Sequence, residues 1–161
     1  MEYEELIKAF EFAENLRFSY DVPSETYDLD QEILRNIETD RSHSSLIISE
    51  KVTPEIYLVL TKVCKNLFLD PQNVSAYIFS SPENQAACFL GKKDKCTMMI
   101  TSNLIELMNA NELEFVIGHE IGHFLLKHGT VTHNSKMSKE DLILSRYKEI
   151  SADRIGLIAS G

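Results

Sequence analysis

Cysteine is scarce in this chain of 161 residues, which contains only Cys64, Cys88 and Cys96. An odd number of cysteines without any C-x-x-C spacing is typical neither of a disulfide framework nor of a thiolate zinc site. The cysteine pattern therefore favours a reducing compartment.

The chain also lacks the segments that direct a protein into a membrane. Its start, Met1-Glu2-Tyr3-Glu4-Glu5, has neither the basic region nor the apolar core of a signal peptide, and no apolar run approaches a membrane span. Basic residues are in deficit, with 16 Lys and Arg against 25 Asp and Glu. We expect a soluble, cytoplasmic protein. Neither nucleic acid nor an anionic membrane is expected as a partner, because both are bound through clustered basic residues.

Glycine and proline are not in excess, and 43% of the residues are hydrophobic. This composition argues against disorder and predicts a single domain over residues 1–161. Residues 1–50 are a leading segment with helical spacing over 3–18 and a short helix at 31–37. It is expected to pack against the rest of the domain; a propeptide or a lid over a cleft is the alternative.

Residues 51–161 form the predicted core, of class α+β and mainly helical. Thr53-Pro54-Glu55 begins a buried helix over residues 54–68. A small sheet of about three strands follows at 74–79, 86–90 and 96–101, with the last two strands joined as a hairpin. Three more helices are predicted: residues 103–108, a helix from a capping box at Asn111 and Glu114 to Gly129, and a last helix from Ser138 onward.

The most specific motif lies on the helix that begins near Asn111. It is His119-Glu120-Ile121-Gly122-His123, an HExxH pattern. Residues i and i+4 of a helix lie roughly 40° and 6 Å apart, so His119 and His123 can hold one metal ion. Glu120 lies about 60° to the side, which suits a general base better than a third ligand. The pattern indicates a hydrolase with one zinc ion; the alternative is a helix with two merely polar or core histidines.

Small residues indicate how a third ligand reaches this helix. Gly118 and Gly122 flank His119, and the residues around Glu149 on the last helix are also small: Ser145, Ala152 and Gly156. We infer that these two faces cross closely, since glycines inside helices usually permit close backbone approach. The crossing makes Glu149 the third ligand, and Asp153 one turn later is placed to orient the imidazole of His119.

The other histidines are weaker candidates. On a continuous helix His128 lies about 180° from His119, within the apolar stripe, which predicts a core or helix-terminal role. His133 lies in a polar stretch, either as an electrophilic helper at a cleft or as an ordinary solvated residue. His43 has no informative context.

The segment from Val116 to His123, with Glu149-Ile150-Ser151-Ala152-Asp153 downstream, resembles the gluzincin zinc peptidases. It is most similar to metallopeptidase family forty-eight, the HtpX-like and CAAX prenyl protease group, whose pattern is HExxH followed by ExxxD. The resemblance covers roughly two-thirds of the chain and implies a zincin-like core. It implies zinc ligands His119, His123 and Glu149, catalytic Glu120, and a substrate-lining edge strand at Ala86, Ala87, Cys88 and Phe89.

The resemblance also implies the activity of a zinc-dependent metalloendopeptidase. Zinc would polarise the scissile carbonyl and lower the pKa of its water, while Glu120 takes the proton and delivers it to the leaving amine. The expected partner is a peptide or protein substrate that adds to the edge strand. Many relatives are embedded in a membrane or continue beyond the ExxxD helix. This chain is therefore either truncated at Gly161 or a minimal gluzincin, and membrane association through further sequence stays open.

Two other functions are weighed against this one. A cytosolic regulatory peptidase of the ImmA/IrrE type also carries HExxH and a downstream glutamate, but Asp153 and the strand-rich upstream segment favour family forty-eight. A non-catalytic zinc-stabilised binding module would keep the three ligands yet have no need of Glu120.

Overall fold

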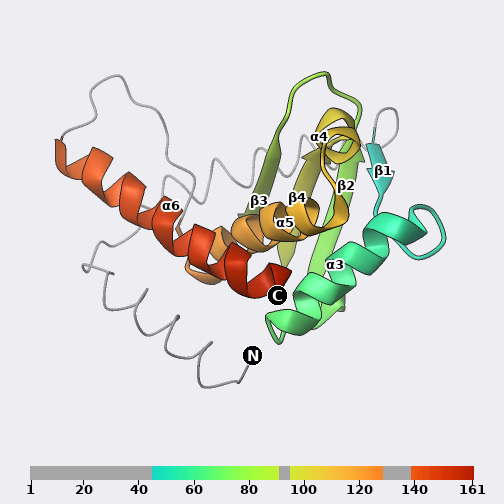
Figure 1. The fold of residues 1–161 in the computed structure, drawn as a ribbon, viewed down its shortest axis with the longest axis horizontal. Helices are drawn as coiled ribbons and strands as arrows, with labels where there is room; N and C mark the ends of the chain where they lie inside the picture. Colours follow the sequence, from blue (N-terminus) through green and yellow to red (C-terminus); the bar gives the residue numbers. More distant parts are fainter. Residues whose placement is uncertain (1–44, 91–94, 129–138) are drawn as a thin grey trace.

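The computed structural model describes residues 45–90, 95–128 and 139–161. Within these ranges the chain forms four α-helices, one short 3-10 helix and one four-stranded sheet (Figure 1). In chain order the elements are β1 (Ser45–Ile47), α3 (Pro54–Asn66), η1 (Pro71–Asn73), β2 (Val74–Phe79), β3 (Ala86–Leu90), β4 (Cys96–Thr101), α4 (Ser102–Leu107), α5 (Ala110–Leu125) and α6 (Lys139–Ser160). The helices predicted at 3–18 and 31–37, and the residues His43 and His133, lie outside the described ranges.

The strands lie in the order β1-β2-β4-β3. The central pair β2 and β4 is parallel, while β1 and β3 pair antiparallel at the two edges. The predicted hairpin of β3 and β4 is confirmed. The prediction of about three strands is wrong, because β1 adds a fourth. This strand has only three residues, and both Leu46 and Ile47 are exposed, so it carries no alternation of buried and exposed positions that a sequence pattern could reveal.

One hydrophobic core joins the sheet to the helices. α5 lies across the sheet in Figure 1 and contacts β3, β4, α3 and α6. The largest fully buried aliphatic and methionine side chains come from α3, β4, α5 and α6. They are Leu60, Val63, Met98, Ile100, Ile117, Ile121 and Ile155. Each contributes about 1.5–3 kcal/mol relative to an exposed position. α5 is therefore held rigidly from several sides.

The start of α5 is fixed by a capping box that begins two residues before the predicted one. The side chain of Asn109 accepts hydrogen bonds from the backbone N–H groups of Asn111 and Glu112, and Glu112 accepts one from the N–H of Asn109. The predicted pair, Asn111 and Glu114, is wrong because Glu114 points inward. It is 4% exposed, with Lys62 Nζ 2.7 and 2.8 Å from its two carboxylate oxygens.

The end of α5 also differs from the prediction. The helix ends at Leu125, before Gly129, and Lys127 takes the left-handed conformation with a φ of 50°. The N–H groups of Lys127 and His128 then donate to the carbonyl oxygens of Phe124 and His123. This is the Schellman arrangement, which glycine usually supplies. The left-handed conformation of Lys127 turns the chain so that His128 lies beside His123.

Cys88 and Cys96 form a disulfide between β3 and β4. The sequence pattern predicted no disulfide, so this pairing is a correction. In the antiparallel register Leu90 lies opposite Cys96 and Cys88 opposite Met98. Residues 88 and 96 are thus diagonal neighbours on the same face of the hairpin, a relation that depends on the turn and not on cysteine spacing.

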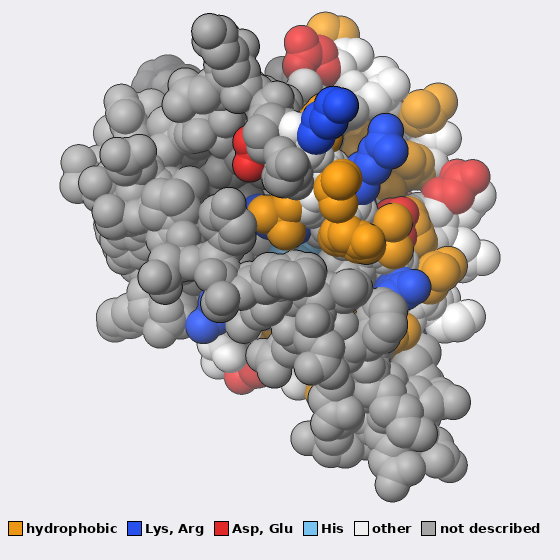
Figure 2. All heavy atoms as spheres, turned by 90° about the vertical axis from the view of Figure 1, so that its left-hand side faces the viewer, with side chains coloured by type: hydrophobic (Ala, Val, Ile, Leu, Met, Phe, Trp, Pro, Cys, Tyr) orange, Lys and Arg blue, Asp and Glu red, His pale blue; other side chains and the backbone are white. Residues whose placement is uncertain are grey.

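The first half of α6 carries several exposed hydrophobic side chains. Figure 2 shows hydrophobic side chains gathered between Lys and Arg side chains on the face to the left of Figure 1, where α6 begins. The exposed large hydrophobic residues in this half are Leu142, Ile143 and Tyr147, and exposed Ile150 follows directly after it. The second half of α6 buries Ala152, Ile155 and Ala159 against α5 and the core, although Leu157 on its other side is exposed.

Candidate metal centre

Two helices supply the site residues that the sequence predicted. α5 carries His119, Glu120 and His123, and α6 carries Glu149 and Asp153. The two helices approach closely because glycine faces small residues. A Cβ at Gly122 would lie 3.0 Å from the Cβ of Ile155 and 3.2 Å from the Cα of Ala152, and one at Gly118 would overlap Ala159. The predicted contact of Gly118 and Gly122 with the small face of α6 is confirmed for Ala152 and Gly156, and for Ser145 it stays a prediction.

This crossing brings three donor groups to one point. His119 Nε2 and His123 Nε2 are 3.0 Å apart, and Glu149 Oε2 lies 3.4 Å from the first and 3.6 Å from the second. Zinc–nitrogen and zinc–oxygen distances of about 2.0–2.1 Å in a tetrahedral site give ligand-to-ligand distances of about 3.3 Å. The observed separations match this geometry, so the three side chains could hold one metal ion.

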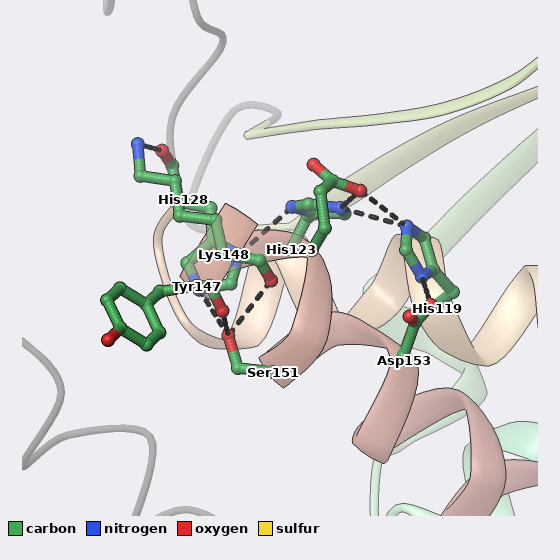
Figure 3. Close-up of polar contacts among 8 residues, drawn as sticks. His119, His123, His128, Tyr147, Lys148, Ser151 and Asp153 are labelled. Carbon is green, nitrogen blue, oxygen red and sulfur yellow. Dashed lines mark hydrogen bonds and ion pairs between the residues drawn. The ribbon is translucent and has the colours of Figure 1, made fainter. Parts of the chain in front are cut away.

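Each imidazole is also held on its far side (Figure 3). Asp153 Oδ1 lies 2.9 Å from Nδ1 of His119, as the ExxxD spacing predicted. Nδ1 of His123 lies 3.0 Å from Nδ1 of His128. Such contacts leave only Nε2 of each ring to face Glu149, which is the orientation that metal-bound histidines adopt.

The contact of His128 with His123 was not predicted. The helical wheel placed His128 on the far side from His119 because it assumed a helix that continues to Gly129. The helix instead ends at Leu125, and the turn at Lys127 brings the ring of His128 beside His123. No residue pattern marks this ending, since the residue with positive φ is a lysine and not a glycine.

Comparison with known proteins identifies the family. Residues 50–140, more than half of the chain, match the sequence profile of Peptidase family M48. The chain belongs to peptidase family M48. This assignment favours the predicted family forty-eight over the ImmA/IrrE type, and it implies peptide or protein substrates. No curated protein and no solved structure matches the chain. Among the described residues no helix has both the length and the apolar character to cross a membrane.

The M48 match includes the HExxH motif but ends before Glu149 and Asp153. The inclusion of Glu149 in the donor group depends on the geometry alone, through its distances to both histidines.

Glu120 sits between the donor group and the edge strand β3. Burial, and then the nearby charge of Glu149, raise the pKa of its carboxyl to about 7, while a hydrogen bond with the backbone of Cys88 acts in the opposite direction. A cation held by the donor group would lower this pKa again, because a nearby positive charge favours the charged form of the carboxyl. Burial also lowers the pKa of His123, which favours the neutral imidazole that metals bind.

The four predicted substrate-lining residues all lie on β3, which is an edge strand. Their side chains point to two different faces. Ala86 and Cys88 pack against the main core that includes α5, whereas Ala87 and Phe89 pack with Phe79 and Met99 in a small cluster. Ala86, Cys88 and the backbone of β3 therefore lie on the side of the sheet where α5 carries Glu120. Ala87 and Phe89 point to the other side.

Proposed function

We propose that this M48 chain is a zinc-dependent metalloendopeptidase. In this proposal His119, His123 and Glu149 hold one zinc ion, and Glu120 is the general base. The observation that carries it is the convergence of two imidazole nitrogens and one carboxylate oxygen at mutual distances of 3.0–3.6 Å. Two nitrogens and one oxygen are also the donor set of many catalytic zinc sites, which leave a fourth position open.

Bound zinc would polarise the scissile carbonyl and make the attacking water more acidic. The work of Glu120 follows from its position. It is half-buried, next in sequence to His119, and close enough to Glu149 for the charge of that residue to raise its pKa. A carboxylate there can take a proton from water and deliver it to the leaving amine. Asp153 holds His119 in the orientation that presents Nε2.

We further propose that the substrate binds in extended form along β3. The strand has a free edge because its only strand partner in the described sheet is β4. A peptide can add to such an edge by backbone hydrogen bonds. The hydrogen bond between Glu120 and the backbone of Cys88, in the middle of β3, supports this proposal. A peptide bond lying along β3 would therefore pass close to both Glu120 and the three donors.

The proposal is tested with internally quenched peptides and casein, using zinc-loaded wild type and the variant Glu120→Gln. Glutamine keeps the shape of the side chain but cannot accept a proton. The variant should bind one zinc per chain, measured by elemental analysis, and lose about 10²–10⁴-fold in kcat. The matched control is Glu106→Gln, an exposed glutamate on α4, which should cleave at the wild-type rate.

Two outcomes would contradict the proposal. Equal rates for wild type and Glu120→Gln would remove Glu120 from the mechanism. A zinc-loaded wild type that cleaves none of the peptides would favour the non-catalytic binding module instead.

A further inference from the structure

We infer that His128 and Ser151 are positioning residues that fix the ring of His123 in the metal-binding orientation. This inference rests on the proposed zinc site. It starts from a chain of polar contacts seen in Figure 3. His123 Nδ1 lies 3.0 Å from His128 Nδ1, and His128 Nε2 lies 3.3 Å from Ser151 Oγ. Ser151 Oγ in turn lies 2.9 Å from the carbonyl oxygens of Tyr147 and Lys148.

The direction of these hydrogen bonds can be assigned from the metal end. An imidazole that binds a metal through Nε2 carries its proton on Nδ1. His123 must therefore donate from Nδ1, so that Nδ1 of His128 is the acceptor. A neutral His128 that accepts at Nδ1 carries its own proton on Nε2. That proton points at Ser151 Oγ.

The direction can be assigned independently from the serine end. Ser151 is 6% exposed, and its hydroxyl has one proton to donate. Two carbonyl oxygens of its own helix compete for that proton at 2.9 Å. The hydroxyl oxygen is then left as an acceptor toward His128, which again requires the proton of His128 on Nε2. Both ends of the chain demand the same tautomer, so every link has one donor and one acceptor.

The position of His128 is fixed by its backbone as well. Its N–H donates to the carbonyl oxygen of His123, 3.0 Å away, and its carbonyl oxygen accepts a hydrogen bond from Nζ of Lys148. The left-handed conformation of Lys127 directs the chain into this place. His128 is thus bonded to the helix that carries two of the donors and to the helix that carries the third.

The test measures zinc affinity by competition with a chelator. His128→Phe keeps a planar ring but removes both ring nitrogens, and zinc should bind about 10–100-fold more weakly. His128→Asn places an amide oxygen near the position of Nδ1 and should recover most of the loss. Ser151→Ala removes only the last link and should cost about fivefold. The matched control is Ser160→Ala. The hydroxyl of Ser160 also donates a hydrogen bond to a carbonyl oxygen within α6, but it is remote from the hydrogen-bond chain of His123, His128 and Ser151.

A second measurement reports the tautomer itself. In ¹⁵N-labelled, zinc-loaded protein, long-range ¹H–¹⁵N spectra should show His128 protonated on Nε2 and unprotonated on Nδ1, with the signals assigned by their loss in His128→Asn. Thermal melts of all variants establish that they fold.

The outcomes separate the inference from the proposed function. If His128→Phe binds zinc as tightly as wild type, or if His128 carries its proton on Nδ1, the positioning role is overturned while the zinc site stands. If folded His128→Asn binds zinc as weakly as His128→Phe, the hydrogen bond from His123 does not cause the difference in zinc affinity, and the positioning role is overturned as well. If wild type binds no zinc, both proposals fail.

Discussion

His119 and His123 both direct Nε2 toward Glu149, yet the nitrogens on the far sides of their rings meet different partners. Asp153 lies behind His119; it is charged, and its side chain is 54% exposed. Behind His123 lies His128, which leads to the buried hydroxyl of Ser151. A carboxylate attracts a cation electrostatically, and salt screens this attraction. The uncharged hydrogen-bond chain through His128 and Ser151 only orients the ring of His123, and salt leaves that effect intact. We call His119 with Asp153, and His123 with His128 and Ser151, the two halves of the centre. These halves are therefore expected to respond differently to the same perturbation.

The largest effect is expected where both halves depend on one contact, the crossing of α5 and α6. Ala152 is fully buried, and its Cα lies against Gly122. Ala152→Leu should force the helices apart and remove stoichiometric zinc binding, while the far-ultraviolet circular dichroism stays helical. The control is Lys139→Leu, at an exposed position of the same helix. Full zinc loading of Ala152→Leu would show that the close crossing does not hold the donors together.

The next prediction separates the two halves by salt. Asp153→Asn keeps an acceptor for His119 but removes the charge, so zinc affinity should fall about tenfold at low salt. The ratio of wild-type to variant affinity should shrink as sodium chloride is raised to about 1 M, where the screening length is only about 3 Å. The ratio for His128→Phe should stay constant over the same range. Equal salt dependence in the two variants would erase the distinction between the two supports.

A third prediction concerns the opposite end of α5, which supports the fold and not the site. Lys62→Met leaves the carboxylate of Glu114 buried without its cation and should lower the free energy of unfolding by about 1–3 kcal/mol. This expected loss in the free energy of unfolding is smaller than for a fully buried ion pair because the side chain of Lys62 is 51% exposed. Urea titration measures it, with exposed Lys65→Met as control. Zinc affinity should not change; a parallel loss would show that the two ends of α5 are coupled.

The smallest effect is expected at the one cysteine outside the disulfide. Cys64 is fully buried, and burial followed by the charge of Asp70 raises its pKa to about 11. At pH 8 its thiol is protonated and should not react with a disulfide reagent in native protein, with or without zinc. One thiol should appear on unfolding, and three after reduction. Rapid native labelling of Cys64, or labelling that depends on zinc, would contradict this description.

The sequence predicted the parts of the site that depend on regular helices. HExxH, the small residues around Glu149 and the spacing to Asp153 all follow from positions on a helical wheel, and the helices that carry them are continuous through those positions. The three longer strands were also found, because each carries a run of β-favouring residues with clear breaks on either side.

What the sequence could not reveal depends on where regular structure stops. His128 reaches His123 only because α5 ends at Leu125 through a lysine with positive φ, which propensity disfavours. The capping box was misplaced because Asn-x-x-Glu occurs twice in succession, and only the burial of Glu114 against Lys62 decides between the two. The Cys88–Cys96 pair depends in the same way on the register of the hairpin.

The most direct test of the central claim is anomalous diffraction at the zinc edge from a crystal of the zinc-loaded protein. The predicted result is one peak per chain, about 2.0–2.1 Å from Nε2 of both His119 and His123 and about 2.0–2.2 Å from a carboxylate oxygen of Glu149. A peak elsewhere, or a Glu149 carboxylate turned away from both histidines, would contradict the claim that these three side chains form a catalytic zinc site.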